Sequence, residues 1–481
     1  MIQSPLLRHF SGYIDGKWTG TSSGQTFAVT NPATGQTLAD LPNMAAAETA
    51  AAIESAEAAW KQDAPLDERR RWLLEIHRLL NDNKQELARI ITLEQGKPIK
   101  ESVVEVEYSA GFFSFFAEQL HHLDPEPLPD RIRGMRWTIH HRPAGVAGLI
   151  TPWNFPLAML AKKLAPALAA GCGTVTKPPA PTPLTSLALW HLLEQVNLPR
   201  GRANLVIGRP TPIGDTLCSH PAVRIISFTG STEVGKVLMA KVAAHVKRLA
   251  LELGGNAPYI VMEDADLISA ADALMANKFR CAGQTCVCAN RVYVHRGIAD
   301  AFTREMAERV SKLKVGDGLS TETDIGPLIN RAAFDKVDHH VRDALERGAK
   351  RVVGGDRKRP EGDWGAFYTP TVLTGTTAEM LVSKDETFGP VVAIATFESD
   401  EQAIDLANST PYGLASYLFT RDQARGERLT ARLRFGHVGV NSGTGPTPQA
   451  PFGGMKQSGF GREGGVEGMI EFCESQTVVT P

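Results

Sequence analysis

The chain has 481 residues, of which 43% are apolar and 22% are charged. At about 150 residues per domain, this length predicts two or three domains with sizeable cores. Lysine plus arginine (51) nearly balances aspartate plus glutamate (53), so no summed field would steer the chain toward nucleic acid or an anionic membrane. We therefore expect a small-molecule partner.

The N-terminal residues 1–8 lack a continuous apolar core as long as that of a signal peptide. No later apolar run approaches the ~20 residues that a bilayer demands. Six cysteines in 481 residues lack the density of a disulfide scaffold, which favours a reducing compartment. These features predict a cytoplasmic protein with no membrane partner, and we expect no metal cofactor.

The predicted elements begin with helices over residues 45–122. Apolar side chains recur there at helical spacing, as at Trp72, Leu73, Ile76, Leu79 and Leu80. The proline-rich segment 124–129 ends this run, because proline disfavours helix at itself and at the residue before it. In residues 135–141 the side-chain character alternates, which predicts a β-hairpin arm. We expect the edge of this arm to pair with a partner.

Residues 145–255 alternate between short apolar runs and helical patterns. The predicted strands are Val146–Ile150, Gly173–Thr176, Asn204–Ile207, Arg224–Phe228 and Leu249–Leu253, and the helices are Leu157–Leu168, Leu184–Val196, Pro212–Cys218 and Ser231–Val246. Repeated βαβ units predict a doubly wound parallel sheet, whose ligand binds beyond the carboxyl ends of the strands. A second α/β stretch follows over residues 256–440, and residues 471–479 suggest a last strand.

Cys286 is a candidate nucleophile, since it follows a predicted helix and lies just beyond the flexible Gly283. A thiolate there would attack a carbonyl carbon, and N–H groups at a nearby helix start would lower its pKa. The alternative is a small buried cysteine, which is the commonest role of a lone one.

Glu252 and Asn154 each follow a predicted core strand. Glu252 is placed to act as a general base that activates water, or else to bind backbone N–H groups or a lysine. Asn154 would aim its amide N–H at an oxyanion, although asparagine beside prolines is also ordinary turn chemistry.

Three further segments have features of a dinucleotide site. Lys177 follows a strand and would reach ribose hydroxyls, although an exposed loop lysine looks the same. Gly230 and Ser231 open a helix whose free N–H groups would favour a pyrophosphate, but a Gly-x-Gly-x-x-Gly motif is lacking. Glu386 and Phe388 lie in a glycine-proline turn that is unremarkable alone.

Taken in order, the segments resemble the aldehyde dehydrogenase superfamily from about Gly12 to Gly464. The motifs are Thr-Pro-Trp-Asn-Phe-Pro (151–156), Phe-Thr-Gly-Ser (228–231), Leu-Glu-Leu-Gly-Gly (251–255), Gly-Gln-Thr-Cys (283–286), Glu-Thr-Phe-Gly-Pro (386–390) and Pro-Phe-Gly-Gly (451–454). Their combination is highly specific, so the resemblance implies the fold as well as the site.

The resemblance implies that an aldehyde is oxidised to its carboxylate through a thiohemiacetal and a thioester on Cys286. Asn154 and the backbone N–H of Cys286 would form the oxyanion hole, and Glu252 would activate the hydrolytic water. The implied cofactor-binding residues are Trp153, Lys177, Ala180, Gly230, Ser231, Leu253, Glu386 and Phe388.

The family fold would supply a Rossmann-type dinucleotide domain, a second α/β catalytic domain and a β oligomerisation arm. The implied ranges are 1–122 and 143–254 for the dinucleotide domain, 255–440 for the catalytic domain, 123–142 and 468–481 for the arm, and 441–467 for a return segment. Such an arm would assemble a homodimer or homotetramer.

Within the superfamily, the motifs around Cys286 and over 453–459 are most similar to succinate-semialdehyde dehydrogenases. Arg280 takes the carboxylate-binding position, whereas Lys162 replaces a second expected arginine and Thr447 is a substitute for a serine. Alternatives are glutarate semialdehyde, another aliphatic or aromatic aldehyde, a CoA-acylating relative, or a non-enzymatic crystallin-like descendant. The retained Glu252 argues against the CoA-acylating relative, and the joint presence of Cys286, Glu252 and Asn154 argues against the crystallin-like descendant.

Two finer expectations concern the cofactor and redox control. NADP is expected in preference to NAD, because Ala180 stands where NAD-preferring relatives carry a glutamate that would repel the 2′-phosphate. Cys288 is expected to form a reversible disulfide with Cys286 if the loop allows bonding geometry, the alternative being that it only packs.

Overall fold

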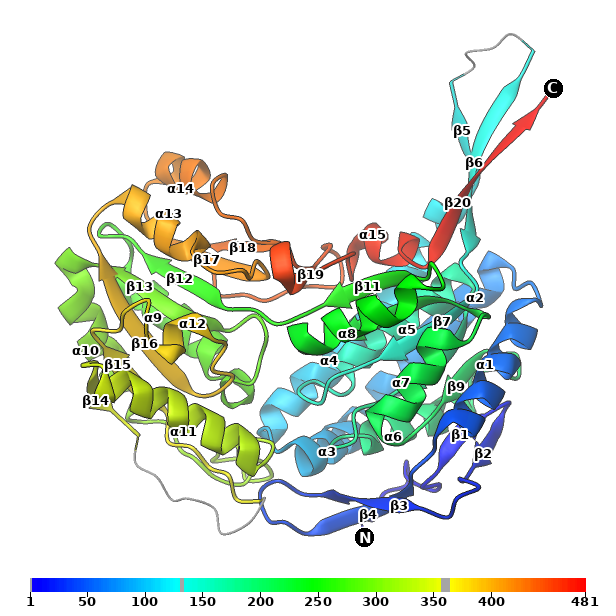
Figure 1. Ribbon diagram of the computed structural model, residues 1–481, viewed down its shortest axis with the longest axis horizontal. Coiled ribbons are helices and arrows are strands. Elements are labelled where there is room, and N and C mark those ends of the chain that lie inside the picture. The colour runs from blue at the N-terminus through cyan, green and yellow to red at the C-terminus, as the bar shows by residue number, and fades with distance from the viewer. Residues whose placement is uncertain (1, 130–133, 356–363) are drawn as a thin grey trace.

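The computed structural model describes residues 2–129, 134–355 and 364–481. Two α/β lobes lie side by side, and a narrow β arm projects away from them, as Figure 1 shows. Each lobe is built around its own sheet and its own apolar core. The α/β class expected from the sequence is confirmed.

The first lobe contains an eight-stranded sheet in the order β19-β11-β10-β7-β8-β9-β1-β2. The five central strands pair in parallel, as the βαβ pattern predicts. The strands are β1 (Gly12–Ile14), β2 (Lys17–Thr19), β7 (Val146–Ile150), β8 (Gly173–Lys177), β9 (Ala203–Leu205), β10 (Val223–Thr229), β11 (Arg248–Glu252) and β19 (Gly459–Phe460).

The helices of this lobe begin with four in the N-terminal range where the sequence predicts helices. They are α1 (Ala46–Trp60), α2 (Leu66–Asp82), α3 (Lys84–Gln95) and α4 (Ile99–Gln119), followed by α5 (Ala158–Ala170), α6 (Leu184–Leu193), α7 (Pro210–Ser219) and α8 (Thr232–Ala243). The predicted apolar face of α2 is buried. Helix α5 is buried along its whole length, including Lys162 and Lys163. Lysines almost never lie fully buried without partners, so this helix points to an internal charge network.

The second lobe contains a seven-stranded sheet in the order β14-β15-β16-β13-β12-β17-β18. The strands are β12 (Ala257–Val261), β13 (Ala289–His295), β14 (Lys350–Val353), β15 (Thr371–Thr374), β16 (Val391–Phe397), β17 (Ala415–Phe419) and β18 (His437–Val440). Its helices are α9 (Leu267–Lys278), α10 (Ala299–Val310), α11 (Arg331–Glu346), α12 (Leu381–Lys384), α13 (Asp400–Asn408) and α14 (Gln423–Thr430). Residues 356–363 of the expected catalytic range lie outside the described residues.

The arm consists of β6 (Arg136–Pro143) between β5 (Glu126–Leu128) and β20 (Cys473–Thr480), all antiparallel. It leaves the first lobe beside α15 (Gly465–Ile470) (Figure 1). A two-stranded ribbon, β3 (Thr26–Thr30) with β4 (Thr37–Pro42), lies near the N-terminus. Residues 130–133 of the expected arm lie outside the described residues. Within the part of the chain that the structure describes, no helix is long and apolar enough to cross a membrane.

Strands β7, β10 and β11 run parallel and therefore end at one edge of the first sheet. Asn154 follows β7, Gly230 follows β10, and Glu252 is the last residue of β11. The carboxyl edge of a doubly wound sheet is the place where such folds bind ligands.

Candidate active site

A cavity of about 980 Å³ lies at this edge and takes its lining from both lobes. Most of the residues singled out from the sequence line it. They are Asn154, Lys162, Glu252, Arg280 and Cys286, together with Trp153, Gly230, Ser231, Leu253, Glu386 and Phe388.

A strained turn carries Cys286 into the cavity. After α9, residues Cys281, Ala282 and Gly283 all have positive φ angles, of 53°, 54° and 74°. A side chain at Gly283 would place its Cβ 2.2 Å from the carbonyl oxygen of Gly389, so glycine is required there. The buried backbone N–H of Cys281 donates to the Glu101 carboxylate at 2.7 Å. This bond helps to hold a turn that costs about 1–2 kcal/mol for each non-glycine residue.

The Cys286 thiol donates to Oε1 of Glu252, with 3.3 Å between Sγ and the oxygen. Burial first, and the nearby Glu252 carboxylate second, raise the pKa of this thiol well above its ordinary value. This corrects the expectation that helix-start N–H groups lower its pKa, since Cys286 lies in a loop before β13. The thiol is therefore protonated at neutral pH, and Glu252 is its nearest proton acceptor.

Asn154 is fixed through its side-chain amide and its backbone carbonyl. Its Nδ2 donates to the carbonyl oxygen of Gln284 at 2.9 Å, and its own carbonyl accepts from Lys97 at 2.6 Å. Lys97 forms a fully buried ion pair with Glu105 at 2.6 Å. An amide nitrogen has two N–H donors, so Asn154 keeps one for a ligand in the cavity.

The carboxylate of Glu252 takes part in a buried charge network. Its Oε2 lies 3.0 Å from Nζ of Lys162, which also lies 2.7 Å from Oε2 of Glu463. Lys163 pairs with the other oxygen of Glu463 and donates to Ser227 at 3.1 Å. Burial raises the pKa of Glu252, while Lys162 and Lys163 hold the pKa of Glu463 far below its ordinary value despite burial. The sequence assigned Lys162 to the substrate, but its ammonium contacts the candidate base.

The guanidinium of Arg280 stands at another wall of the cavity, 5.2 Å from the ring centre of Phe155. It forms no ion pair with any carboxylate among the described residues, and its buried Nε has no hydrogen-bond partner there. A buried guanidinium nitrogen without a partner is costly and is suited to accept an anionic ligand.

Part of the cavity lining has features that fit a dinucleotide. Ser231 caps the N-terminus of α8, and a Cβ at Gly235 would lie 2.6 Å from Leu253, so this helix packs closely on the end of β11. Trp153 and Phe388 meet edge to face at 5.7 Å. Burial raises the pKa of Glu386 to about 7, and its Oε1 accepts from the Gly255 N–H at 3.4 Å. Free helix N–H groups, aromatic rings and an acid are the partners of pyrophosphate, nicotinamide and ribose.

Four predicted residues lie away from this lining as far as the structure describes it. Lys177 ends β8 and Ala180 follows it, beside the end of β7. Thr447 is exposed and its hydroxyl donates to Gln449 at 2.6 Å. Cys288 is buried, and its thiol donates to the carbonyl of Gly283 at 3.3 Å. All six cysteines are free.

Besides Lys97, Glu105 and Lys163, three residues of this site were not foreseen from the sequence. Glu463 lies in a Gly-Arg-Glu-Gly stretch that reads as surface, and Glu101 and Tyr108 lie on a helix with many acids. The Tyr108 hydroxyl is buried without a hydrogen-bond partner among the described residues, and burial raises its pKa to about 12. Unusual burial of polar groups marks all three, and only the three-dimensional structure reveals it.

A thiol beside a carboxylate, at the carboxyl edge of a doubly wound sheet, has the arrangement of a nucleophilic enzyme site with room for a dinucleotide. Comparison with known proteins agrees: residues 18–478 match the aldehyde dehydrogenase family. The chain belongs to this family, whose members oxidise aldehydes with NAD(P) through a cysteine-bound thiohemiacetal.

Full-length relatives support the assignment. The chain is 45% identical to 3-sulfolactaldehyde dehydrogenase of Pseudomonas putida, covering 99% of this chain and 98% of that one. It is 47% identical to the mitochondrial succinate-semialdehyde dehydrogenase of Arabidopsis thaliana, covering 99% and 90%. A crystal structure of succinate-semialdehyde dehydrogenase from Burkholderia pseudomallei is 46% identical, with a TM-score of 0.97 over 100% of this chain and 99% of that one.

Proposed function

We propose that this chain oxidises a short aldehyde bearing an acid group at its far end, with succinate semialdehyde as the first candidate. The observation that carries the proposal is Arg280, a cavity-lining guanidinium without an ion pair to any described carboxylate. Arginine binds a carboxylate through two parallel N–H bonds and so fixes the distance from the acid to the aldehyde. Both relatives described above are named for aldehydes that carry an acid group.

We further propose specific roles for the residues around Cys286. The Glu252 carboxylate accepts the thiol proton across their 3.3 Å contact, and Sγ then attacks the aldehyde carbon. The resulting oxyanion accepts hydrogen bonds from Nδ2 of Asn154 and the backbone N–H of Cys286. A bound nicotinamide would supply the hydride acceptor, and loss of hydride from the thiohemiacetal would leave a thioester on Cys286. Glu252, having released its first proton, then removes a proton from the water that hydrolyses this thioester.

The test of substrate class is Arg280→Leu, assayed with succinate semialdehyde and with butanal as a neutral control of equal chain length. We expect KM for succinate semialdehyde to rise about tenfold or more, equivalent to ~1.4 kcal/mol, because a charge-assisted contact is lost. KM for butanal should change much less. Equal losses on both substrates would show that Arg280 is structural and that the acid group is not recognised.

Chain length is a finer point of the same proposal. A lone guanidinium holds one end of the substrate, so glutarate semialdehyde, which is one methylene longer, should also be oxidised. A panel of semialdehydes, scored by kcat/KM with both cofactors, distinguishes the candidates.

For the cofactor we propose NADP in preference to NAD. Lys177 is buried and forms no ion pair with any described carboxylate, and its pKa, lowered by burial to about 8, still leaves it mainly charged at pH 7, so an incoming phosphate would meet an unpaired cation. Ala180 adds no negative charge to oppose it. We expect kcat/KM to favour NADP, and Ala180→Glu should reverse this preference while Ala180→Gln should not. A wild-type kcat/KM for NAD that is tenfold higher than for NADP would contradict the proposal.

We also propose that the projecting arm assembles the chain into a homodimer or homotetramer in the cytoplasm. In the described structure β20 is an edge strand of the three-stranded arm. It pairs with β6 on one side, and its other side is unpaired. Edges of this kind are satisfied by a partner. Light scattering of the full chain, beside a variant that ends before Cys473, measures whether assembly depends on the arm.

A further inference from the structure

The ammonium of Lys162 is engaged mainly by carboxylates of the protein itself. An ammonium has three N–H donors. The nitrogen donates to Glu252 at 3.0 Å, forms an ion pair with Glu463 at 2.7 Å, and lies 4.8 Å over the ring of Phe452. The side chain is 1% exposed. The sequence suggested Lys162 for substrate recognition, but its ammonium instead contacts two carboxylates of the protein.

Glu252 connects this lysine to the nucleophile. One carboxylate oxygen accepts from the Cys286 thiol, and the other contacts Lys162 and accepts from the Thr229 hydroxyl at 3.4 Å. The two oxygens thus bind different groups, the nucleophile on one side and Lys162 with Thr229 on the other. These contacts together fix the orientation of the carboxylate plane. The charged and titratable groups that face it are Lys162 and Lys163 from α5, Tyr108 from α4, Glu463 from the segment before α15, and Cys286.

The network is electrically balanced. Two ammonium groups, Lys162 and Lys163, meet two carboxylates, Glu252 and Glu463. A carboxylate alone at this depth would take up a proton rather than stay charged. A base must be unprotonated to act on water, so a neighbouring cation decides whether Glu252 is usable at neutral pH.

We propose that Lys162 is a positioning residue for the catalytic base, which holds the Glu252 carboxylate ionised and turned toward Cys286. The proposal rests on the role of Glu252 proposed above. It assigns recognition of the substrate's acid group to Arg280 and not to Lys162. It also predicts that substitutions at the two positions have different kinetic effects: those at Arg280 raise KM, and those at Lys162 shift the pH dependence of hydrolysis.

The test is the pH dependence of thioester hydrolysis, the step in which Cys286 no longer carries a proton. Hydrolysis needs ionised Glu252, so its rate rises with pH through the pKa of that group. Lys162→Met removes the cation. We therefore expect the acidic limb of the pH–rate profile, the range over which hydrolysis speeds up with rising pH, to move up by about one pH unit or more. KM for succinate semialdehyde should stay within about twofold of wild type. Lys162→Arg, which keeps the charge, should leave the limb near its original position.

A second variant protects the test against a folding defect. Lys162→Met with Glu463→Gln removes one cation and one anion, so the network stays balanced through Lys163 and Glu252. Because Glu463 raises the pKa of Glu252, the double variant should shift the limb less than Lys162→Met alone. Circular dichroism of each variant reports folding independently of activity.

Two outcomes would overturn the proposal in different ways. An unmoved limb in Lys162→Met, with a tenfold rise in KM for succinate semialdehyde but not for butanal, would make Lys162 a substrate residue. Persistence of the acidic limb in the residual hydrolysis of Glu252→Gln would show that Glu252 is not the base, and the premise would fail. Loss of the limb in Glu252→Gln, together with its shift in Lys162→Met, supports both assignments.

Discussion

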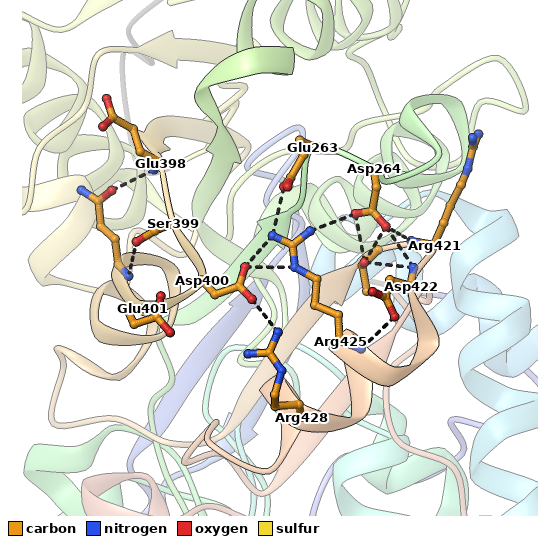
Figure 2. Close-up of polar contacts among 12 residues, drawn as sticks. Glu263, Asp264, Glu398, Ser399, Asp400, Glu401, Arg421, Asp422, Arg425 and Arg428 are labelled. Atoms are coloured by element: carbon orange, nitrogen blue, oxygen red, sulfur yellow. Dashed lines mark hydrogen bonds and ion pairs between the residues drawn. The ribbon is translucent and has the colours of Figure 1, made fainter.

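Two clusters of charged side chains join distant parts of this chain, and they differ mainly in their access to water. We call the first the base network: Lys162, Lys163, Glu252 and Glu463, all nearly inaccessible. The second, the surface network, is centred on Arg425, which contacts Glu263, Asp264 and Asp400, while Arg428 also contacts Asp400 (Figure 2). Both clusters consist of close ion pairs between cationic and carboxylate side chains.

Their electrostatics differ because burial decides the balance between desolvation and attraction. In the base network, burial raises the pKa of Glu252 even with a lysine 3.0 Å away. In the surface network, hydrogen bonding to Arg425 outweighs desolvation and lowers the pKa of Asp400. Breaking a buried pair typically costs 3–5 kcal/mol, whereas an exposed pair contributes ~0–1 kcal/mol. We therefore expect changes in the two networks to differ in kind as well as in size.

The largest effect is expected for Glu252→Gln. The amide cannot accept a proton from water, so steady-state turnover should fall by about 10³-fold or more. The single burst of reduced nicotinamide, which stopped-flow absorbance measures, should also become slower, because the amide cannot take up the Cys286 proton. A burst at the wild-type rate would show that Glu252 is not the acceptor of the Cys286 proton.

Glu463→Gln should mainly affect stability. It leaves Lys162 and Lys163 with a single buried carboxylate, so the free energy of unfolding should fall by ~3 kcal/mol at pH 7. Because the folded pKa of Glu463 is depressed, its contribution is present above the ordinary value of 4.5 and is lost as pH falls below it. Denaturant unfolding at pH 7 and pH 4 measures both. The exposed Glu401→Gln is the matched control, and an equal cost there would contradict the distinction.

The fold was largely predictable because it depends on local periodicity. Strand β7 and helix α5 follow directly from apolar runs and helical spacing, and the end of β11 correctly placed Glu252 at the sheet edge. The base network was not predictable. Glu463 is distant in sequence from Glu252 and has no hydrophobic pattern of its own. Lys162 was placed at the cavity, but no periodicity indicates which wall a side chain faces on a helix that is buried all round.

Cys288 differs from both networks, because it makes buried polar contacts in which no carboxylate takes part. Its sulfur lies 3.7 Å from Nζ of Lys278 and donates to the Gly283 carbonyl. We predict that peroxide converts Cys286 to a sulfenic acid, which condenses with the Cys288 thiol and releases water. Dithiothreitol should then restore wild-type activity but not that of peroxide-treated Cys288→Ala. Untreated Cys288→Ala should keep its activity within about twofold. The same recovery in both proteins would mean that Cys288 only packs.

The smallest effect is expected for Arg425→Met, which removes the centre of the surface network. Glu263 and Asp264 retain access to water and the more buried Asp400 keeps Arg428, so the free energy of unfolding should fall by only ~1–2 kcal/mol at pH 7. The cost should shrink as pH falls below about 4, because the depressed pKa of Asp400 makes its stabilisation present above the ordinary value of 3.8 and lost below it. The limb of thioester hydrolysis should not move, since Arg425 does not touch the base network. Urea unfolding at two pH values and the hydrolysis profile measure these effects, with the exposed Arg296→Met as control. A shift of the limb in Arg425→Met would mean that the two networks communicate through the second lobe, and their separation by burial would no longer hold.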